Sequence, residues 1–360
     1  MKIELLVDSA EFWARLQDDV RRCRQRVYLQ TMSFEGDRVG VALGEALESC
    51  GANDRRLLVD SYSLLFHNDR LIPGPAWLSP AFRAEFRSTL SWISRLRRSG
   101  VGVRLANPLK PRLTQLLKRN HKKLVVVDDR VSYIGGINFC EHNFDWHDAM
   151  LRIESPELAE HLSTDFLSSW QGTPKRSDQT LGHLRVLSLN GERNPEGFAP
   201  VLEAVEAALD RIDVVSPYLS PPFTDHLAEA ARRGVRVRVL TPRRNNKVHL
   251  AAFIQEATRR HGFRLHHYPH RMNHTKAMII DERTLVVGST NFDTVSYYLM
   301  DELFVMTDDP ALVQRFRQRI WDPDAGRPAS EPSRRSAGTV LLDQYVRGAA
   351  RLLSGLTGAS

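Results

Sequence analysis

A doubled segment constrains the fold of this chain more than any other feature of its sequence. The stretch NHKKLVVVDDRVSYIGGIN at residues 120–138 matches the stretch NHTKAMIIDERTLVVGSTN at residues 273–291 without a gap, at a constant offset of 153 positions. Five chemically distinctive residues of the first copy, His121, Lys123, Asp128, Gly135 and Asn138, recur as His274, Lys276, Asp281, Gly288 and Asn291. Because the apolar runs between them agree as well, we predict two related halves.

Each copy of the segment predicts the same local structure. Short β-branched runs, LVVV and VSYIGG in the first copy and AMII and TLVVGS in the second, flank a charged turn, which indicates a buried hairpin. Amphipathic helical patterns also alternate with apolar strand patterns. Helices are predicted at 12–25, 40–50, 201–211 and 223–234, and each is followed by a predicted strand, at 26–34, 55–63, 212–219 and 235–242. The predicted fold class is therefore α/β, with two similar sandwich halves of mixed sheets flanked by helices. We expect pseudo-twofold symmetry between them and an active site at their interface.

The predicted domains follow from this repeat. We expect an N-terminal half at 1–172 with the first motif, a C-terminal half at 173–325 with the second, and a tail at 326–360. The turn-rich stretch 171–194 is expected to link the halves, with a strand pattern inside it, and the proline-rich stretch 66–80 to form an exposed loop. Apolar residues at helical spacing in the tail favour a helix that packs against the body, with membrane-surface contact as the alternative.

Composition narrows the class of protein. Hydrophobic residues make up 42% of the 360 positions, and Gly and Pro are near average usage, which excludes collagen-like, low-complexity and wholly disordered chains. No run of about 18 uncharged apolar residues occurs, so we expect neither a membrane span nor a signal peptide. Three widely spaced cysteines form neither a disulfide framework nor a metal-binding CxxC pair, and we therefore expect a reducing compartment, the cytoplasm.

Positive charge is concentrated in two stretches. The chain has 50 Lys and Arg against 43 Asp and Glu, a net charge of +7. Between Glu85 and Asp128 there are eleven basic residues and no acidic one, and a second basic stretch runs from 232 to 247. Such clusters suit a polyanion, either a nucleic acid or an anionic lipid surface, although solvated helix faces have the same composition.

The histidine and lysine of each motif are two positions apart, which places them on one face of a strand. If the halves face each other, two imidazoles and two ammonium groups share one pocket. One imidazole can then attack a phosphodiester while the other protonates the leaving oxygen and later deprotonates an alcohol or water. The ammonium groups offset charge at a pentacovalent phosphorus, so we expect no metal and no other cofactor. The chemistry implied is phosphoryl transfer through a covalent phosphohistidine.

The two segments resemble the paired HxKxxxxD signatures of the phospholipase D superfamily, and within it the bacterial cardiolipin synthases. The further matching patterns are Arg119-Asn120 before the first motif, GGIN after it, Trp146-His147-Asp148, and GSTNFD leading to Leu299 and Glu302. The resemblance covers about residues 8–320. It implies a phosphatidyltransferase whose partners are an anionic phospholipid such as phosphatidylglycerol and an alcohol or water acceptor, with cardiolipin and glycerol as the expected products.

The resemblance also implies roles for single residues. His121 is expected to be the nucleophile and His274 the general acid and base, with Lys123 and Lys276 beside them, although sequence symmetry alone does not decide which histidine attacks. Asp128 and Asp281 complete the catalytic motifs, and we expect them to order the turn. The phosphate-binding residues expected are Asn138, Asn291 and Ser289. Glu302, and Asp148 or Asp301, are expected to accept a hydrogen bond from a catalytic imidazole.

The chain departs from the synthase pattern at several places. Val295 stands where that pattern has Arg, and Met300 stands where it has Asn. These departures concern the acceptor alcohol rather than the reaction class. The N-terminal membrane-anchoring helices of some cardiolipin synthases are missing as well, so any contact with the cytoplasmic face of a membrane is expected to be peripheral.

Two alternatives stay open at this point. Hydrolytic phospholipase D activity uses the same chemistry with water as the acceptor, and a metal-independent nuclease of the same superfamily would suit the basic stretches. A zinc site among the five histidines from His261 to His274 is disfavoured, because Pro269 breaks helical spacing and no cysteine lies nearby. The sequence predicts no oligomeric state.

Overall fold

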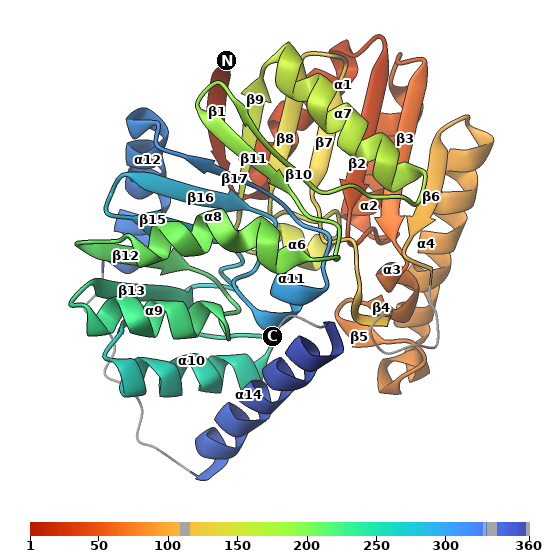
Figure 1. The fold of residues 1–360 in the computed structure, drawn as a ribbon. Helices are drawn as coiled ribbons and strands as arrows, with labels where there is room; N and C mark the ends of the chain where they lie inside the picture. Colours follow the sequence, from red (N-terminus) through yellow and green to blue (C-terminus); the bar gives the residue numbers. More distant parts are fainter. Residues whose placement is uncertain (109–115, 327–328, 330–336, 358–360) are drawn as a thin grey trace. The chain divides into compact units, whose positions relative to one another are not determined.

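The structure is a computed structural model that describes residues 1–108, 116–326, 329 and 337–357. The chain divides into two compact units, Met1–Lys175 and Arg176–Ser360. One large mixed sheet with helices packed against it forms the body of each unit (Figure 1). The prediction of two α/β halves is therefore confirmed.

The first unit contains a seven-stranded sheet in which three neighbouring strands are parallel and the others antiparallel. The strand order is β1 (Lys2–Val7), β9 (Ala149–Glu154), β8 (Val131–Gly135), β7 (Leu124–Val127), β2 (Arg26–Thr31), β3 (Asp54–Asp60) and β6 (Gly102–Ala106). Its helices are α1 (Asp8–Arg22), α2 (Arg38–Ser49), α3 (Tyr62–Leu65), η1 (Pro75–Leu78), α4 (Pro80–Arg98), α6 (Glu141–Phe144) and α7 (Pro156–Trp170).

The central strands are apolar on both faces because helices cover both. On β2, Val27 and Leu29 are fully buried in the core that α1, α2 and α4 contribute to. Tyr28 between them points the other way and stacks on Phe166 of α7, with ring centroids 4.8 Å apart. Figure 1 shows α7 lying across this second face of the sheet. The near-continuous apolar runs seen in the sequence are thus those of strands buried on both sides.

The second unit contains an eight-stranded sheet. The strand order is β10 (Ser177–Leu181), β11 (Leu184–Ser188), β17 (Leu303–Thr307), β16 (Thr284–Gly288), β15 (Ala277–Ile280), β12 (Arg211–Val215), β13 (Arg236–Pro242) and β14 (Arg264–Tyr268). Its helices are α8 (Asn194–Glu206), α9 (Phe223–Arg232), α10 (Val248–His261), α11 (Thr294–Tyr298), α12 (Pro310–Phe316), η2 (Arg317–Trp321), α13 (Asp322–Ala325) and α14 (Ala337–Thr357).

The two sheets share one topology. The order β1-β9-β8-β7-β2-β3-β6 of the first unit corresponds strand by strand to β11-β17-β16-β15-β12-β13-β14 of the second, with β10 added at the edge. Details of side-chain packing recur too. The Arg56 guanidinium on β3 lies over Trp170 at 5.4 Å, and Arg238 on β13 lies over Trp321 at 4.8 Å. The repeated motif therefore marks two copies of one fold.

The structure bears on two expectations about local segments. The two units divide after Lys175, within the stretch 171–194, and the strand expected in this stretch is confirmed as β11, which forms an antiparallel hairpin with β10 that turns at Gly182 with φ +60°. Leu184, Val186 and Leu187 of β11 are buried, and the strand pairs with β17 and so extends the sheet. The stretch 66–80 also contains a small hairpin, β4 (Phe66–His67) and β5 (Arg70–Leu71), and His67 within it is fully buried. A polar side chain at such a position needs partners that local sequence does not reveal.

The C-terminal helix α14 packs on α10 through part of its apolar stripe. Val346, Ala350 and Leu353 are buried, and Asp343 pairs with Arg260 of α10 at 2.9 Å. The rest of the stripe is exposed, by 49–65%: Leu341, Tyr345, Leu352 and Leu356. Packing against the body is thus confirmed for one side of the helix. Among the described residues, no helix has the length and apolar character needed to cross a membrane.

A buried ion pair in the first unit gives a test of this fold. The Lys122 ammonium lies 2.8 and 2.9 Å from the two oxygens of Asp165 on α7, and both side chains are almost fully buried. Asp165→Ala leaves the buried ammonium without this carboxylate. We expect it to lower the free energy of unfolding by about 3–5 kcal/mol, measured by urea denaturation followed by circular dichroism.

The matched control is Asp178→Ala, because Asp178 binds Arg185 through two hydrogen bonds of 2.7 and 2.8 Å at the surface. That pair is about 40% exposed on each side, so its loss should cost less than about 1 kcal/mol. Similar losses in the two variants would show that burial of the Lys122 pair has no special role in stability.

Candidate active site

In the first unit, the motif residues lie in the extended stretch that leads directly into β7. His121 and Lys123 are 5% and 1% exposed, and the Lys123 ammonium donates a hydrogen bond of 2.8 Å to the His121 carbonyl. Lys122 between them points to the opposite face, toward Asp165. Successive side chains of an extended backbone point to opposite faces, so His121 and Lys123 share one face and Lys122 lies on the other. The spacing of histidine and lysine in the motif is explained by this alternation.

A buried carboxylate that sequence reasoning missed anchors this stretch. Asp60, at the end of β3, accepts the backbone N–H of Asn120 at 2.6 Å and a hydrogen bond from Arg119 at 3.2 Å. Burial raises the pKa of Asp60 to about 6, and the Arg119 guanidinium opposes that shift. The side chain of Asn120 also accepts a hydrogen bond of 2.8 Å from Gln30. The residues just before His121 are therefore fixed by the neighbouring strands β2 and β3.

In the second unit, the same extended stretch leads into β15. His274 and Lys276 are 5% and 1% exposed, and the Lys276 ammonium lies 2.6 Å from Nδ1 of His274 and also contacts its carbonyl oxygen. Tyr218 meets the His274 ring edge-on at 6.3 Å, and the ammonium of Lys247 lies 4.0 Å from the centre of the Tyr218 ring. Tyr218 and Lys247 were not predicted as site residues, because neither belongs to the repeated segment.

Backbone hydrogen bonds show how the candidate acidic partners Asp148, Asp301 and Glu302 correspond between the two units. Gly136 N–H donates to the carbonyl of Ala149, and Ser289 N–H donates to the carbonyl of Leu303 in the same register. The residues before those two carbonyls, Asp148 and Glu302, are therefore equivalent, and both are buried. Asp301 lies one position further back, at the place that corresponds to His147.

The two equivalent carboxylates are accommodated differently. A Cβ atom on Gly136 would lie 2.3 Å from an oxygen of Asp148, so this glycine leaves room for the carboxylate. In the second unit the residue at that place is Ser289, whose hydroxyl donates to Glu302 at 2.5 Å and accepts the N–H of Leu303 at 2.9 Å. Ser296 donates to the other oxygen of Glu302 at 2.8 Å. The Ser289 hydroxyl thus orients Glu302, and the phosphate contact expected of Ser289 stays a prediction.

The two motif asparagines are buried in their own units. The Asn138 side chain accepts a hydrogen bond of 3.2 Å from Thr31 on β2 and donates one of 2.9 Å to Asn143 on α6. Asn291 is 4% exposed. The first asparagine is therefore held in one orientation by a strand on one side and a helix on the other.

The motif aspartates close the hairpins at the far ends of the strands. Asp128 follows β7 and Asp281 follows β15, with φ of +53° and +51°, a conformation that Asp tolerates better than most residues. The Asp128 carboxylate accepts backbone N–H groups of residues 24–26, and Asp281 accepts those of residues 209–211. Burial alone would raise both pKa values. The backbone hydrogen bonds, together with one from the Cys23 thiol to Asp128, outweigh it and hold the pKa of each carboxyl below its ordinary value.

Much of the basic charge noted in the sequence is used by the fold. Several basic side chains of the two stretches form ion pairs with carboxylates, among them Arg95, Arg119, Lys122, Arg236 and Arg238. Arg104 instead donates to the backbone carbonyl of Trp170. Lys110 and Arg112 lie outside the described residues. The stretches therefore provide less charge for a polyanion than their composition suggests.

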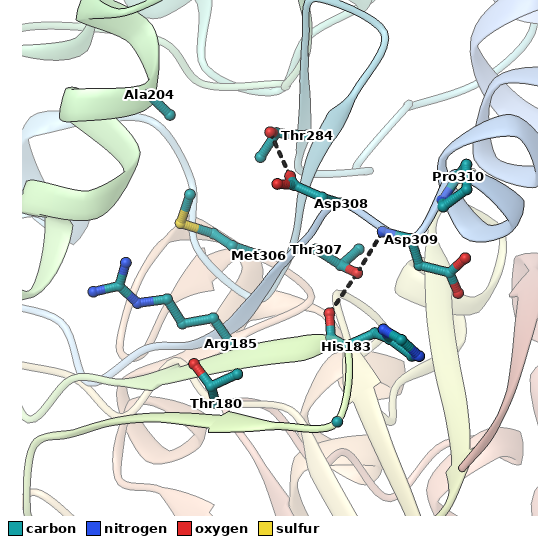
Figure 2. Close-up of a pocket in the computed structure, with 11 residues that line it drawn as sticks. Thr180, His183, Arg185, Ala204, Thr284, Met306, Thr307, Asp308, Asp309 and Pro310 are labelled. Atoms are coloured by element: carbon teal, nitrogen blue, oxygen red, sulfur yellow. Dashed lines mark hydrogen bonds between the residues drawn. The ribbon is translucent and has the colours of Figure 1, made fainter.

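A cavity of about 530 Å³ lies in the second unit, away from these residues (Figure 2). It is lined by His183, Arg185, Thr284 and Asp308 among others, and none of the predicted site residues contributes to it. Thr284 begins β16 and Thr307 ends β17, whereas Ser289 and Glu302 lie at the other ends of these strands. This cavity is thus separate from the motif.

Residues 16–170 and 201–322 match the family described as cardiolipin synthase, phospholipase D-like domain. The chain belongs to this phospholipase D-like family. Both matched ranges include one copy of the repeated motif, so the resemblance stated from sequence is confirmed. As a member of the family, the chain is an enzyme of the phospholipase D superfamily, in its phosphatidyltransferase class.

Relatives of known name agree with this assignment. The chain is 27% identical over 335 residues to the minor cardiolipin synthase ClsB of Bacillus subtilis (strain 168), covering 86% of this chain and 78% of the relative. It is 25% identical over 342 residues to cardiolipin synthase A of Salmonella paratyphi A, of which it spans 66%. The crystal structure of phosphatidylserine synthase from Haemophilus influenzae Rd KW20 superimposes with a TM-score of 0.70 at 14% identity, over 98% of this chain and 94% of that one. The similarity to phosphatidylserine synthase supports the fold alone, because the sequence identity is only 14%.

The role of the motif aspartates can be tested through stability. Because the folded-state pKa of Asp128 lies below its unfolded value, its contribution is present above about pH 4 and is lost as the pH falls through the lowered value. We expect Asp128→Ala to lower the free energy of unfolding by about 1–3 kcal/mol at pH 7. The difference from the unsubstituted protein should shrink below about pH 4, as measured by thermal denaturation at a series of pH values.

The neighbouring exposed residue Asp129 provides the control, and Asp129→Ala should leave stability unchanged within about 0.5 kcal/mol. A variant Asp128→Ala that keeps full stability but loses all activity would instead place this carboxylate in the chemistry.

Proposed function

We propose that the chain is a cardiolipin synthase-like phosphatidyltransferase. It takes a phosphatidyl group from one phosphatidylglycerol molecule and passes it to a hydroxyl of a second, with cardiolipin and glycerol as products. The observation that carries this proposal is the buried His–Lys pair that recurs before equivalent strands of two sheets with the same strand order. Relatives named as cardiolipin synthases support the choice of substrate.

The proposal requires the two His–Lys pairs to act on one phosphorus atom. In the first step His121 attacks phosphorus, a P–N bond forms, the bond to the glycerol oxygen breaks, and His274 gives that oxygen a proton. In the second step the acceptor hydroxyl gives its proton to His274, its oxygen attacks phosphorus, and the P–N bond breaks. Two in-line displacements retain the configuration at phosphorus.

The remaining site residues support these steps in the proposal. Lys123 and Lys276 offset the negative charge that grows on the phosphoryl oxygens, which is the largest electrostatic demand of the reaction. Asn138 and Asn291 donate to the same oxygens. The equivalent carboxylates Asp148 and Glu302 orient the imidazoles, as an acidic third member does in other histidine-dependent sites.

We also propose that the protein works as a peripheral protein at the cytoplasmic face of a membrane. The exposed stripe of α14 supports this, because positions 341, 345, 352 and 356 fall on one side of a helix and carry Leu, Tyr, Leu and Leu. An amphipathic helix of this kind lies in the interface with its apolar side toward the acyl chains. The other side of α14 is held to α10, so the stripe is fixed on the body of the second unit.

The proposed reaction predicts that both histidines are essential. We expect His121→Ala and His274→Ala each to lower kcat/KM for cardiolipin formation by about 10³-fold or more, in the presence of EDTA. Products from labelled phosphatidylglycerol are separated by thin-layer chromatography. Label from [³²P]phosphatidylglycerol should also remain bound to the unsubstituted protein and be absent from His121→Ala.

His226→Ala is the control, since His226 forms a surface pair with Glu206 and lies outside the motif. It should retain full activity. Phosphatidic acid in place of cardiolipin would identify a hydrolase, and cleaved plasmid DNA with unchanged lipid would identify a nuclease; either result contradicts the proposed transferase.

The proposed membrane contact of α14 predicts that charged substitutions in its exposed stripe weaken binding to lipid vesicles. We expect the double substitution Leu341→Asp with Leu352→Asp to weaken co-sedimentation with phosphatidylglycerol vesicles by at least about 10-fold, because each leucine side chain buried in an apolar phase is worth about 1.5–3 kcal/mol. Leu209→Asp is the control, because Leu209 is 88% exposed and lies outside α14. Equal binding by the two variants would show that α14 is not the contact.

A further inference from the structure

A second cluster of chemically active side chains lies in the first unit, outside the repeated motif. Glu35 follows β2, His67 lies on β4, Glu85 on α4, and Cys140 and His142 at the start of α6. Glu35, His67 and Cys140 are at most 2% exposed. Four separate segments of the chain thus bring two imidazoles, a thiol and carboxylates together inside the unit.

The distances in this cluster converge on one atom, Oε2 of Glu35. Nδ1 of His67 and Nδ1 of His142 each lie 3.8 Å from it. The opposite nitrogen of His67, Nε2, faces the outer carboxylate of Glu85 at 2.9 Å. Nε2 of His142 lies 3.9 Å from the Cys140 sulfur and 3.9 Å from the Asp69 carboxylate. Ligating atoms of Glu35, Cys140 and His142 all lie within 4.8 Å of one another. An imidazole with a carboxylate behind it is the usual arrangement of a metal-binding histidine.

The inner atoms of the cluster lack hydrogen-bond partners. Within the part of the chain that the structure describes, Glu35 Oε2 and the Nδ1 atoms of His67 and His142 are buried and form no hydrogen bond. Such atoms are rare in folded proteins and call for a ligand or another explanation. Burial, together with the nearby carboxylates of Asp37 and Glu85, raises the pKa of Glu35 to about 8, and the hydrogen bond from the Asn68 N–H opposes this shift. The cluster therefore combines several carboxyl groups with buried oxygen and nitrogen atoms that have no hydrogen-bond partner.

The second unit shows that the fold does not require this cluster. A bridge between Phe34 and Phe139 in the first unit corresponds to the bridge between Leu219 and Phe292 in the second. The residue after the bridge is Glu35 in one unit and Ser220 in the other. Ser220 is satisfied by Thr294, with 2.9 Å between the two hydroxyl oxygens and 2.9 Å from the Thr294 N–H to the Ser220 oxygen. Ordinary hydrogen bonds thus fill this place where the acidic cluster is absent.

We propose that the cluster binds one Zn²⁺ ion in the first unit. The ligands are the Glu35 carboxylate, the imidazoles of His67 and His142, and the thiolate of Cys140, which gives its proton to solvent on binding. Imidazole, thiolate and carboxylate are the ligands that Zn²⁺ prefers. In a tetrahedral site its bonds of about 2.0–2.3 Å separate neighbouring ligand atoms by about 3.3–3.8 Å, close to the separations around Glu35.

The ion has a structural consequence for the active site. Cys140 and His142 flank the start of α6, and Asn143 of this helix accepts the hydrogen bond from Asn138. A bound ion would therefore fix the segment 138–143 to the hairpin that carries His67. The inference depends on these contacts alone, and it holds whichever substrate the protein uses.

Metal content tests the proposal directly. The full-length protein is treated with EDTA, dialysed against buffered ZnCl₂ and then against metal-free buffer, and zinc is measured by mass spectrometry. We expect about one Zn²⁺ per chain and a higher melting temperature with zinc than without. Glu35→Gln and His142→Gln should weaken binding by about 100-fold, and Glu85→Gln by about 10-fold, as for outer carboxylates of other metal sites.

His226→Ala is the matched control, because Nδ1 of His226 also lies 3.1 Å from a carboxylate, that of Glu206, but near the surface. It should bind zinc as the unsubstituted protein does. Binding below one ion per chain, or equal binding by Glu35→Gln and the control, overturns the proposal.

Binding of Co²⁺ provides a second test, which does not depend on whether the Glu35→Gln and His142→Gln variants fold. Co²⁺ bound to a thiolate gives an ultraviolet charge-transfer band, and we expect this band from the unsubstituted protein and its absence from Cys140→Ser. Cys140→Ser changes one buried atom, and its folding is checked by circular dichroism. Identical Co²⁺ spectra from the two proteins would remove Cys140 from the ligand set and overturn the proposed site.

Discussion

Burying an ammonium group beside each motif histidine is the constraint on which the rest of the structure depends. A charge removed from water is stable only with close polar partners. Lys123 and Lys276 meet this need by donating to the carbonyl of the histidine two residues earlier, which ties side chain and backbone together. The stretches that carry them lead into β7 and β15, which have neighbours on both sides in their sheets. A rigid strand thus holds each pair.

The two units repeat this arrangement and differ in what surrounds it. In the first unit, the buried Asp60 carboxylate binds the segment before His121, and Gly136 leaves room for Asp148. In the second unit, Tyr218 packs against the His274 ring, and the hydroxyls of Ser289 and Ser296 bind Glu302. The two motif histidines therefore lie in similar backbone settings with different neighbours.

The basic stretches illustrate how charge in a sequence and charge in a site differ. Several of their residues are paired with carboxylates distant in sequence, such as Arg238 with Asp213 on the adjacent strand at 2.5 Å. Arg56 and Arg238 also lie over tryptophan rings that cover the same face of each sheet. These arginines hold layers together, so a sum of charges along the chain overstates what is presented to a ligand.

Local patterns determined much of this protein from the sequence alone. The doubled motif, the hairpins that follow it, the helix–strand alternation and the apolar stripe of α14 depend on periodicity and spacing within short segments, and all occur in the structure. Tertiary structure alone decided that Asp60 anchors the first motif, and that Glu35, His67 and His142 meet in one cluster. These contacts join segments that lie far apart in the chain, and the free energy of burying polar groups depends on neighbours that no local pattern specifies.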